Sequence, residues 1–185
     1  IQVSPLDCMS CGNCADICPA KTKALVMKPL DSQMQETDRW TYSQKKVTYK
    51  DELIDKTANV KNSQFAQPLF EFSGACSGCG ETPYIKLITQ LYGEQIMIAN
   101  ATGCASIDGG SAPATPYCRN YRSGHGPAWA NSLFEDNAEY GVGMATANRK
   151  LRDRLEKIMA EAIQKCDCCT EELKELFKRW IGNRE

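Results

Sequence analysis

Apolar residues recur at helical spacing in three stretches of the chain, and each stretch predicts a helix. The three run from Pro83 to Leu91, from Asn148 to Gln164 and from Thr170 to Trp180. Apolar side chains three and four positions apart lie on one face of a helix, where they can pack against the rest of a fold. A short uninterrupted apolar run, Ile96 to Ala99, predicts a buried strand instead.

The region between residues 31 and 61 is polar, and it predicts a connection with little regular structure. Within it, the alternation from Lys46 to Lys50 predicts an edge strand, and residues 51–56 predict a short helical turn. Apolar residues then gather between 65 and 72. We expect them to pack as a core beside the sequence that follows.

Composition narrows the class of protein. The chain has 185 residues, and 42% of them are apolar, which is enough for a core. Lys and Arg number 22 against 23 acidic residues, so no broad positive surface favours nucleic acid. No apolar run reaches the roughly 18 residues that a membrane span needs. We expect neither nucleic acid nor membrane among the partners.

Cysteine is the residue type that points to chemistry, because there are eleven. Residues 8–19 follow the spacing C-x2-C-x2-C-x3-C-P without deviation. In bacterial ferredoxins three thiolates of this motif bind one 4Fe-4S cluster, and the fourth, before proline, binds a second cluster. A zinc knuckle is the alternative, but zinc sites use two separated ligand pairs. The predicted iron-sulfur ligands are Cys8, Cys11, Cys14 and Cys18.

This motif needs a partner motif to complete both clusters, and none follows it in the sequence. We therefore expect the missing half of a two-cluster domain to precede Ile1, which makes this chain a fragment of a longer protein.

A second ligand loop is centred on Cys76 and Cys79, which are separated by two small residues. Gly78 and Gly80 let the backbone fold tightly, so that both sulfurs can face one metal site. The helix and strand predicted after this loop would return Cys104 to it.

Several other features carry weaker interpretations. We expect His125, the only histidine, to be structural, and the acidic residues between 135 and 139 to mark a helix start. The small-residue loop at 109–117 lacks phosphate-binding spacing and predicts close approach to something flat. Cys118 is a possible further ligand that nothing supports. The remaining cysteines are expected to be incidental thiols: Cys166, Cys168 and Cys169.

With both cysteine sets in view, the chain resembles the pyruvate:ferredoxin (flavodoxin) oxidoreductases, large thiamine-diphosphate enzymes with iron-sulfur clusters. Beyond the ferredoxin motif, the resemblance is carried by three long runs: Gly74 to Tyr84, Ala99 to Cys104 and Gly124 to Asn137. It implies a partial α/β thiamine-diphosphate-binding fold plus an α+β ferredoxin-like segment. The domains would be half of a two-cluster ferredoxin domain at 1–30, a connecting segment at 31–72 and part of the thiamine domain at 73–185.

The resemblance also implies which residues meet the cofactors. Cys76, Cys79 and Cys104 would ligate the 4Fe-4S cluster nearest the thiamine, and Glu81 and Cys104 would touch the thiamine cofactor. The loop that holds Mg²⁺ and the diphosphate, the fourth ligand of that cluster and the activating glutamate would lie outside this sequence. We assign no catalytic side chain to it, and we do not expect the segment to be active alone.

The implied reaction is oxidative decarboxylation of pyruvate with coenzyme A, giving acetyl-CoA and carbon dioxide, with electrons passing through the clusters to ferredoxin or flavodoxin. The full-length enzyme would be a homodimer in the cytoplasm or in a reducing organelle of an anaerobe. One alternative is a stand-alone iron-sulfur electron-transfer protein without substrate chemistry. Another is a zinc-stapled structural module.

Overall fold

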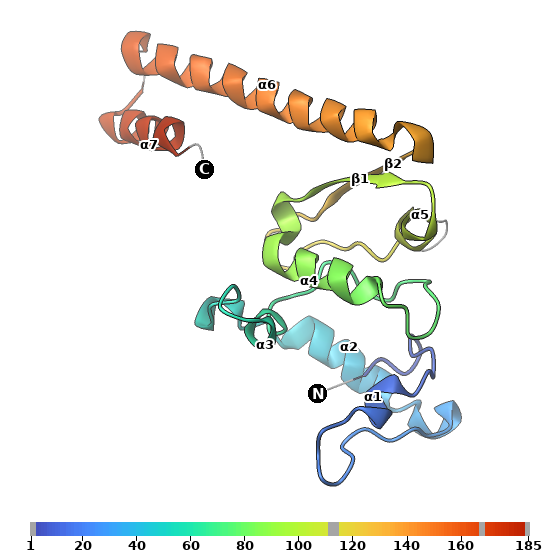
Figure 1. The fold of residues 1–185 in the computed structure, drawn as a ribbon. Coiled ribbons are helices and arrows are strands. Elements are labelled where there is room, and N and C mark those ends of the chain that lie inside the picture. The colour runs from blue at the N-terminus through green and yellow to red at the C-terminus, as the bar shows by residue number, and fades with distance from the viewer. Residues whose placement is uncertain (1–2, 111–114, 167–168, 184–185) are drawn as a thin grey trace. The chain divides into compact units, whose positions relative to one another are not determined.

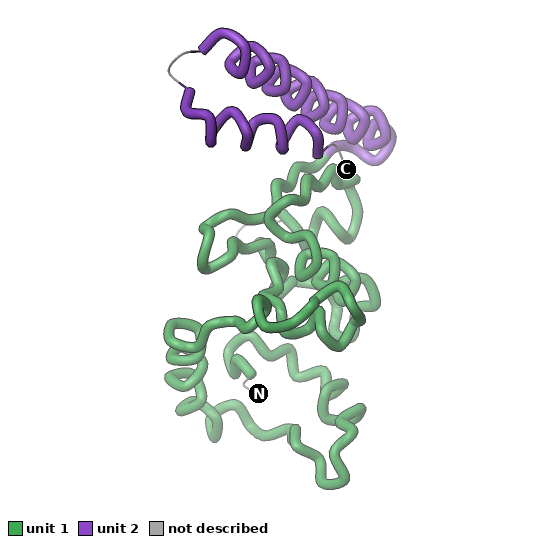
Figure 2. Tube along the Cα trace, turned by 90° about the vertical axis from the view of Figure 1, so that its left-hand side faces the viewer, with its two compact units in different colours: residues 1–131 green, residues 132–185 purple. Residues whose placement is uncertain are grey.

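The computed structural model describes residues 3–110, 115–166 and 169–183, and the chain divides into two compact units, residues 1–131 and 132–185 (Figure 2). Short helices and irregular segments dominate the first unit, whereas the second consists of helices (Figure 1). The elements in chain order are α1 (Asn13–Asp16), η1 (Leu30–Gln33), α2 (Glu36–Lys46), η2 (Asp51–Leu53), α3 (Val60–Ser63), α4 (Thr82–Tyr92), η3 (Gly93–Gln95), β1 (Met97–Ala101), α5 (Cys104–Gly110), β2 (Ala128–Ser132), η4 (Phe134–Asp136), α6 (Asn137–Lys165) and α7 (Glu171–Gly182).

The sheet is a parallel pair, β1 and β2. The Ala128 amide donates to the Ile96 carbonyl at 3.0 Å, and the Asn100 amide group donates to the Asn131 side-chain oxygen at 3.0 Å, so both strands advance in the same direction. A parallel pair needs a crossover connection, and α5 lies within the one that joins these strands. The architecture is therefore mixed helix and sheet, compatible with the expected α/β class.

The core of the first unit lies where α4 meets the segment 66–70. Leu69 is 2% exposed, and its amide donates to the Thr89 hydroxyl at 3.1 Å. Gln90, also 2% exposed, donates to the Ala66 carbonyl at 3.0 Å. The polar side chains of α4 thus form hydrogen bonds with buried backbone groups. Each of these groups, if left unpaired, would destabilise the fold by about 1–3 kcal/mol. The core expected at 65–72 is present in part, around Ala66, Leu69 and Phe70. Phe65 and Phe72, at its two ends, are 56% and 51% exposed and do not belong to it.

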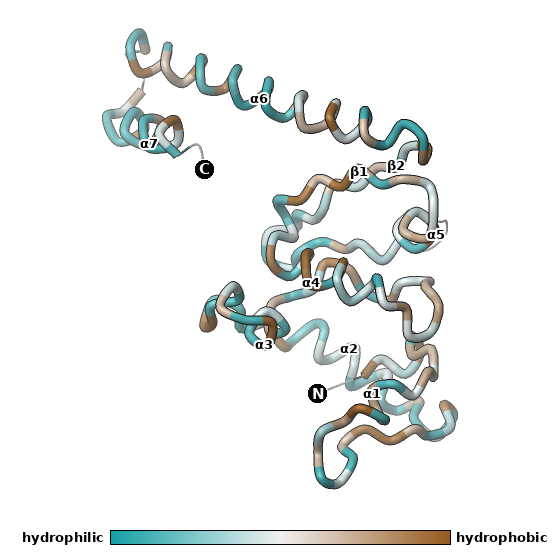
Figure 3. Tube along the Cα trace, viewed as in Figure 1, coloured by the Kyte–Doolittle hydropathy of each residue, from teal (hydrophilic) through white to brown (hydrophobic). Residues whose placement is uncertain are grey.

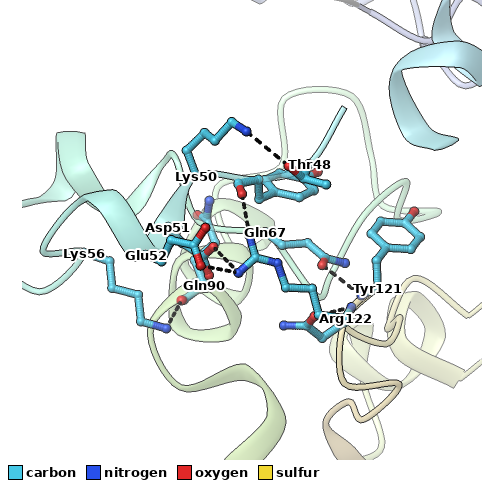
Figure 4. A network of polar contacts seen from close by, with 11 residues as sticks. Thr48, Lys50, Asp51, Glu52, Lys56, Gln67, Gln90, Tyr121 and Arg122 are labelled. Carbon is cyan, nitrogen blue, oxygen red and sulfur yellow. Dashed lines mark hydrogen bonds and ion pairs between the residues drawn. The ribbon is translucent and has the colours of Figure 1, made fainter. Parts of the chain in front are cut away.

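The polar region after residue 30 is more helical than its sequence suggests. The predicted edge strand at 46–50 is wrong, because α2 continues to Lys46 and residues 47–50 form no strand. The Tyr49 carbonyl instead accepts from the Arg122 guanidinium at 2.8 Å, and Arg122 also pairs with Glu52 at 3.1 Å (Figure 4). The Arg122 side chain, which lies far away in the sequence, therefore donates a hydrogen bond to the Tyr49 carbonyl. In an edge strand, that carbonyl would accept from a neighbouring strand. The predicted turn at 51–56 is present as η2.

The second unit is a pair of helices. Thr170 caps α7, its hydroxyl accepting from the Leu173 amide at 3.2 Å, as a threonine at this position predicts. The Arg152 guanidinium of α6 lies 5.4 Å from the centre of the Trp180 ring of α7. No described residue of either helix is buried, and both carry mostly hydrophilic turns with apolar ones between them (Figure 3). The helix expected from Asn148 is confirmed, but α6 already begins at Asn137.

Across the described residues, every helix is too short or too polar to span a lipid bilayer.

Candidate functional site

The ferredoxin-type motif folds as an open loop that leads into α1. Ser10 and Gly12 both have positive φ, 56° and 78°, which turns the backbone twice within the motif. Such values are costly for most residues and free for glycine. Three of the motif's cysteines are exposed and Cys18 is partly so; all four are free thiols: Cys8, Cys11, Cys14 and Cys18. The loop therefore presents its sulfurs outward rather than packing them in a core.

Backbone amide groups surround the Cys18 sulfur. Its sulfur accepts a hydrogen bond from the Ala24 amide at 3.4 Å. Backbone amides of Ala20, Ala24 and Leu25, in that order of effect, lower the pKa of the Cys18 thiol. The thiolate is the form of cysteine that binds metal. Hydrogen bonds from backbone amides to cluster sulfurs also help to set the reduction potential of an iron-sulfur centre.

A hollow of about 460 Å³ lies beside this loop, and Cys8 and Cys14 both line it. Much of the remaining wall is apolar, including Val3, Val26 and Met27. Sulfur ligands in an apolar wall are the surroundings that a buried iron-sulfur cluster requires. Two of the three thiols predicted for the first cluster therefore line the hollow, and Cys11 does not.

The second cysteine loop is a tight turn. The Cys79 amide donates to the Cys76 carbonyl at 2.9 Å, and Gly78 between them has φ of 73°. This combination is typical of a type II turn, which requires positive φ at its third residue. Both cysteines are free thiols. The turn brings the two residues of the pair close together, as their spacing predicts.

The other residues expected at this site lie at helix starts. Glu81 directly precedes α4, and its carbonyl accepts from the Tyr84 amide at 3.0 Å. Cys104 is the first residue of α5 and is exposed. Helix 83–91 and strand 96–99, the elements expected to connect Cys79 with Cys104, are present as α4 and β1. The expected burial of the strand is wrong, because no residue of β1 is buried and Met97 is 49% exposed.

The structure does not gather a full ligand set. Within residues 3–110, 115–166 and 169–183, no three histidine, cysteine, aspartate or glutamate side chains are placed to hold one metal ion. What the fold brings together are pairs: Cys8 with Cys14 at one hollow, and Cys76 with Cys79 at one turn.

Cys118 is a free thiol like these cysteines, but its pKa is raised. It is partly buried, its thiol donates to the Pro68 carbonyl at 3.6 Å, and burial followed by the nearby Glu71 charge raises its pKa to about 11. A thiol that keeps its proton is a poor metal ligand, which agrees with the absence of support for Cys118 in the sequence.

The cysteines near the C-terminus need one correction. Cys166, expected to be an incidental thiol, is disulfide-bonded. Cys169 is a free thiol, and Cys168 lies outside the described residues.

Gly109 and Gly110, the first two residues of the small-residue stretch, approach the indole of Trp129 closely. A Cβ at Gly110 would lie 2.4 Å from the Cη2 atom of Trp129, and one at Gly109 would lie 3.0 Å from its Nε1 atom. Both glycines belong to α5, and residues 111–114 of the loop lie outside the described part. The sequence alone did not reveal that β2, which carries Trp129, is a strand.

His125 and the acidic residues after it do not join either cysteine loop in the part of the chain that the structure describes. The backbone carbonyl of His125 accepts from the Asn120 amide at 2.8 Å, within a loop. Glu135 and Asp136 form η4 at the start of α6, as expected of a helix start, although Asp136 makes no side-chain cap.

Known proteins resemble the chain over most or all of its length. It is 58% identical over 164 residues to the pyruvate:ferredoxin oxidoreductase of Moorella thermoacetica, a match that covers 89% of this chain and 14% of the relative. It is 52% identical over 185 residues to the pyruvate-flavodoxin oxidoreductase of Klebsiella pneumoniae, covering 100% of this chain and 15% of the relative. It is 53% identical over 166 residues to the pyruvate dehydrogenase [NADP(+)] of Cryptosporidium parvum, covering 89% of this chain and 8% of the relative.

The chain thus spans only a small part of the length of the curated relatives it matches, between 8% and 15% in these three. No family model matches it.

Proposed function

The chain belongs to the pyruvate:ferredoxin (flavodoxin) oxidoreductase family, and from this premise we propose that it is part of an enzyme that oxidatively decarboxylates pyruvate. Coenzyme A would receive the acetyl group, carbon dioxide would leave, and ferredoxin or flavodoxin would take up the electrons.

The substrate has firmer support than the electron acceptor. The three relatives have names that share pyruvate and differ in ferredoxin, flavodoxin or NADP(+), yet all match this segment at more than 50% identity. A segment common to enzymes with three acceptors does not select among them. This shared substrate is the observation that carries the proposal, and it disfavours a stand-alone electron carrier.

We assign 4Fe-4S clusters to the cysteine loops. Bound there, the clusters supply one-electron chemistry to a reaction that releases two electrons. The Cys8–Cys14 hollow and the lowered pKa of Cys18 support the first set of ligands. The Cys76–Cys79 turn supports the second set, to which we add Cys104 as a third ligand. Glu81 and Cys104 are assigned to thiamine diphosphate with Mg²⁺ on the resemblance.

The finer fold and domain assignments remain part of this proposal. Residues 1–30 would be half of a ferredoxin-type domain, 31–72 a connection and 73–185 part of a thiamine-diphosphate-binding domain. The parallel pair β1–β2 with α5 in its crossover supports the α/β character of the last part. We propose a homodimer and a cytoplasmic or otherwise reducing location, which suits the exposed free thiols.

Replacing one ligand tests the assignment within the complete enzyme. Cys76→Ala removes a thiolate from the second loop, so we expect several-fold slower reduction of ferredoxin or flavodoxin with pyruvate and coenzyme A, together with lower iron content. Decarboxylation itself would continue, and release of labelled carbon dioxide measures it separately.

The matched control is Cys118→Ala, which removes a protonated, partly buried thiol with no assigned role. We expect its iron content and acceptor reduction to match those of the unsubstituted enzyme. An unchanged acceptor-reduction rate and iron content in Cys76→Ala would refute the ligand assignment.

A further inference from the structure

The short helix α5 is attached to strand β2 at both of its ends. Just before the helix, the Thr102 hydroxyl accepts a hydrogen bond from the Asn131 side-chain amide at 3.3 Å. At its last two residues, Gly109 and Gly110, an added Cβ would come too close to the indole of Trp129. Trp129 and Asn131 are two positions apart in β2, so both side chains point to the same face of that strand. One face of β2 therefore contacts both ends of α5.

The register of the two strands makes the Asn131 contact part of a longer chain of hydrogen bonds. The Ala128 amide donates to the Ile96 carbonyl, and in a parallel pair this register places residue 131 beside residue 100. The Asn100 side chain donates to the Asn131 side-chain oxygen at 3.0 Å and to the Ala101 carbonyl at 2.8 Å. Asn131 therefore bridges the end of β1 and the loop that follows it.

A second set of hydrogen bonds closes the loop between β1 and α5. The Gly103 amide donates to the Ser106 hydroxyl at 2.9 Å, and that hydroxyl donates to the Gly103 carbonyl at 2.7 Å. Cys104 directly follows this glycine, is the first residue of α5 and is exposed. The position of Cys104 therefore depends on the hydrogen bonds of the loop and on the packing of α5, and not on burial of its own side chain.

We propose that Asn131 is a positioning residue, which holds the start of α5 against β2 through Thr102 and thereby fixes where the Cys104 sulfur lies. Trp129 acts at the other end of the helix by packing, since its indole nitrogen has no hydrogen-bond partner among the residues that the structure describes. This inference deepens the proposed function, which is what assigns Cys104 to the site. Asn131 acts through Thr102 and touches no substrate.

Substitutions in the complete enzyme test this role. Asn131→Leu and Thr102→Val remove the hydrogen bond from its two sides with little change of volume, whereas Thr102→Ser keeps the hydroxyl. The Ser106 and Ile107 amides both donate to the Gly103 carbonyl at 3.2 Å, so their hydrogen exchange reports on the start of α5. We expect about two- to tenfold faster exchange in Asn131→Leu and Thr102→Val, the factor that the loss of one hydrogen bond implies. Thr102→Ser would exchange at the unsubstituted rate.

Kinetics separate a positioning role from a merely stabilising one. Under the proposed function Cys104 meets cofactors and not pyruvate, so a displaced Cys104 would lower kcat for acceptor reduction several-fold and leave the KM for pyruvate unchanged. Because Asn131→Leu and Thr102→Val remove the same bond, their effects would not add in the double variant. The matched control is Asn148→Leu in α6, since the Asn148 side chain makes no hydrogen bond within the described part of the chain. We expect it to change neither measurement.

The inference is overturned if exchange at Ser106 and Ile107 is unchanged in Asn131→Leu and Thr102→Val, or if Thr102→Ser behaves like Thr102→Val. Faster exchange with an unchanged kcat would also overturn it, because Asn131 would then only stabilise the helix. If one variant does not fold, the other tests the same bond. Failure of the proposed function would appear separately, as an unsubstituted enzyme that does not respond to pyruvate, and the exchange rates would then decide alone whether Asn131 holds α5.

Discussion

Single residues show the chemistry of this segment most clearly in the contrast between two cysteines. Backbone amides lower the pKa of Cys18, whereas burial raises that of Cys118. The spacing of the motif predicts Cys18 as a ligand from the sequence alone, because ferredoxin-type spacing is specific. The environment of Cys118 was not predictable, since its burial depends on the distant Pro68 and Glu71.

The raised pKa of Cys118 predicts slow alkylation. A thiol reacts as its thiolate, so raising the pKa from 9.0 to about 11 lowers the reactive fraction about 100-fold at pH 8. We expect iodoacetamide to label Cys118 in the native enzyme with a rate that rises through pH 11 rather than pH 9. Peptide mass spectrometry measures this rate, with the denatured chain as reference. Equal rates in the native and denatured chains would contradict the burial described here.

At the scale of elements, helices were easier to predict than strands and contacts. Three amphipathic stretches were confirmed as helices, namely α4, part of α6 and α7, because apolar spacing of three and four predicts a helix by itself. The apolar face expected to pack is not buried in α6 or α7. The predicted edge strand was wrong and β2 was missed, because both depend on what lies beside the segment. Arg122 bonds the backbone at Tyr49, and β1 provides the partner that makes residues 128–132 a strand.

Replacing glycine by alanine is expected to have opposite effects on stability at two helical positions. Gly110→Ala in α5 would place a Cβ 2.4 Å from the Trp129 ring and would cost about 1–3 kcal/mol. Gly143 in α6 has nothing within 4 Å, so Gly143→Ala would stabilise the helix by about 0.5–1 kcal/mol.

Hydrogen exchange of the complete protein measures both effects. Amides of α5 would exchange faster in Gly110→Ala, and those of α6 about two- to fivefold slower in Gly143→Ala. Unchanged α5 exchange in Gly110→Ala would mean that Trp129 does not pack on this helix in solution.

At the scale of the whole molecule, the proposed function assigns both cysteine sets to iron-sulfur clusters. The sequence predicted both sets as ligands, while the attachment of α5 to β2 through Asn131 and Trp129 became visible only in three dimensions. The described residues bring sulfurs together in pairs and not in full sets. The chain spans 14% and 15% of the length of two of its relatives.

The most direct test of the central claim is the visible absorbance of the complete protein, purified without oxygen, before and after pyruvate and coenzyme A are added. We predict a brown protein whose absorbance bleaches with pyruvate and coenzyme A and returns when oxidised ferredoxin or flavodoxin is supplied. A colourless protein would contradict the iron-sulfur assignment. A brown protein that bleaches with dithionite but not with pyruvate would contradict the proposed reaction.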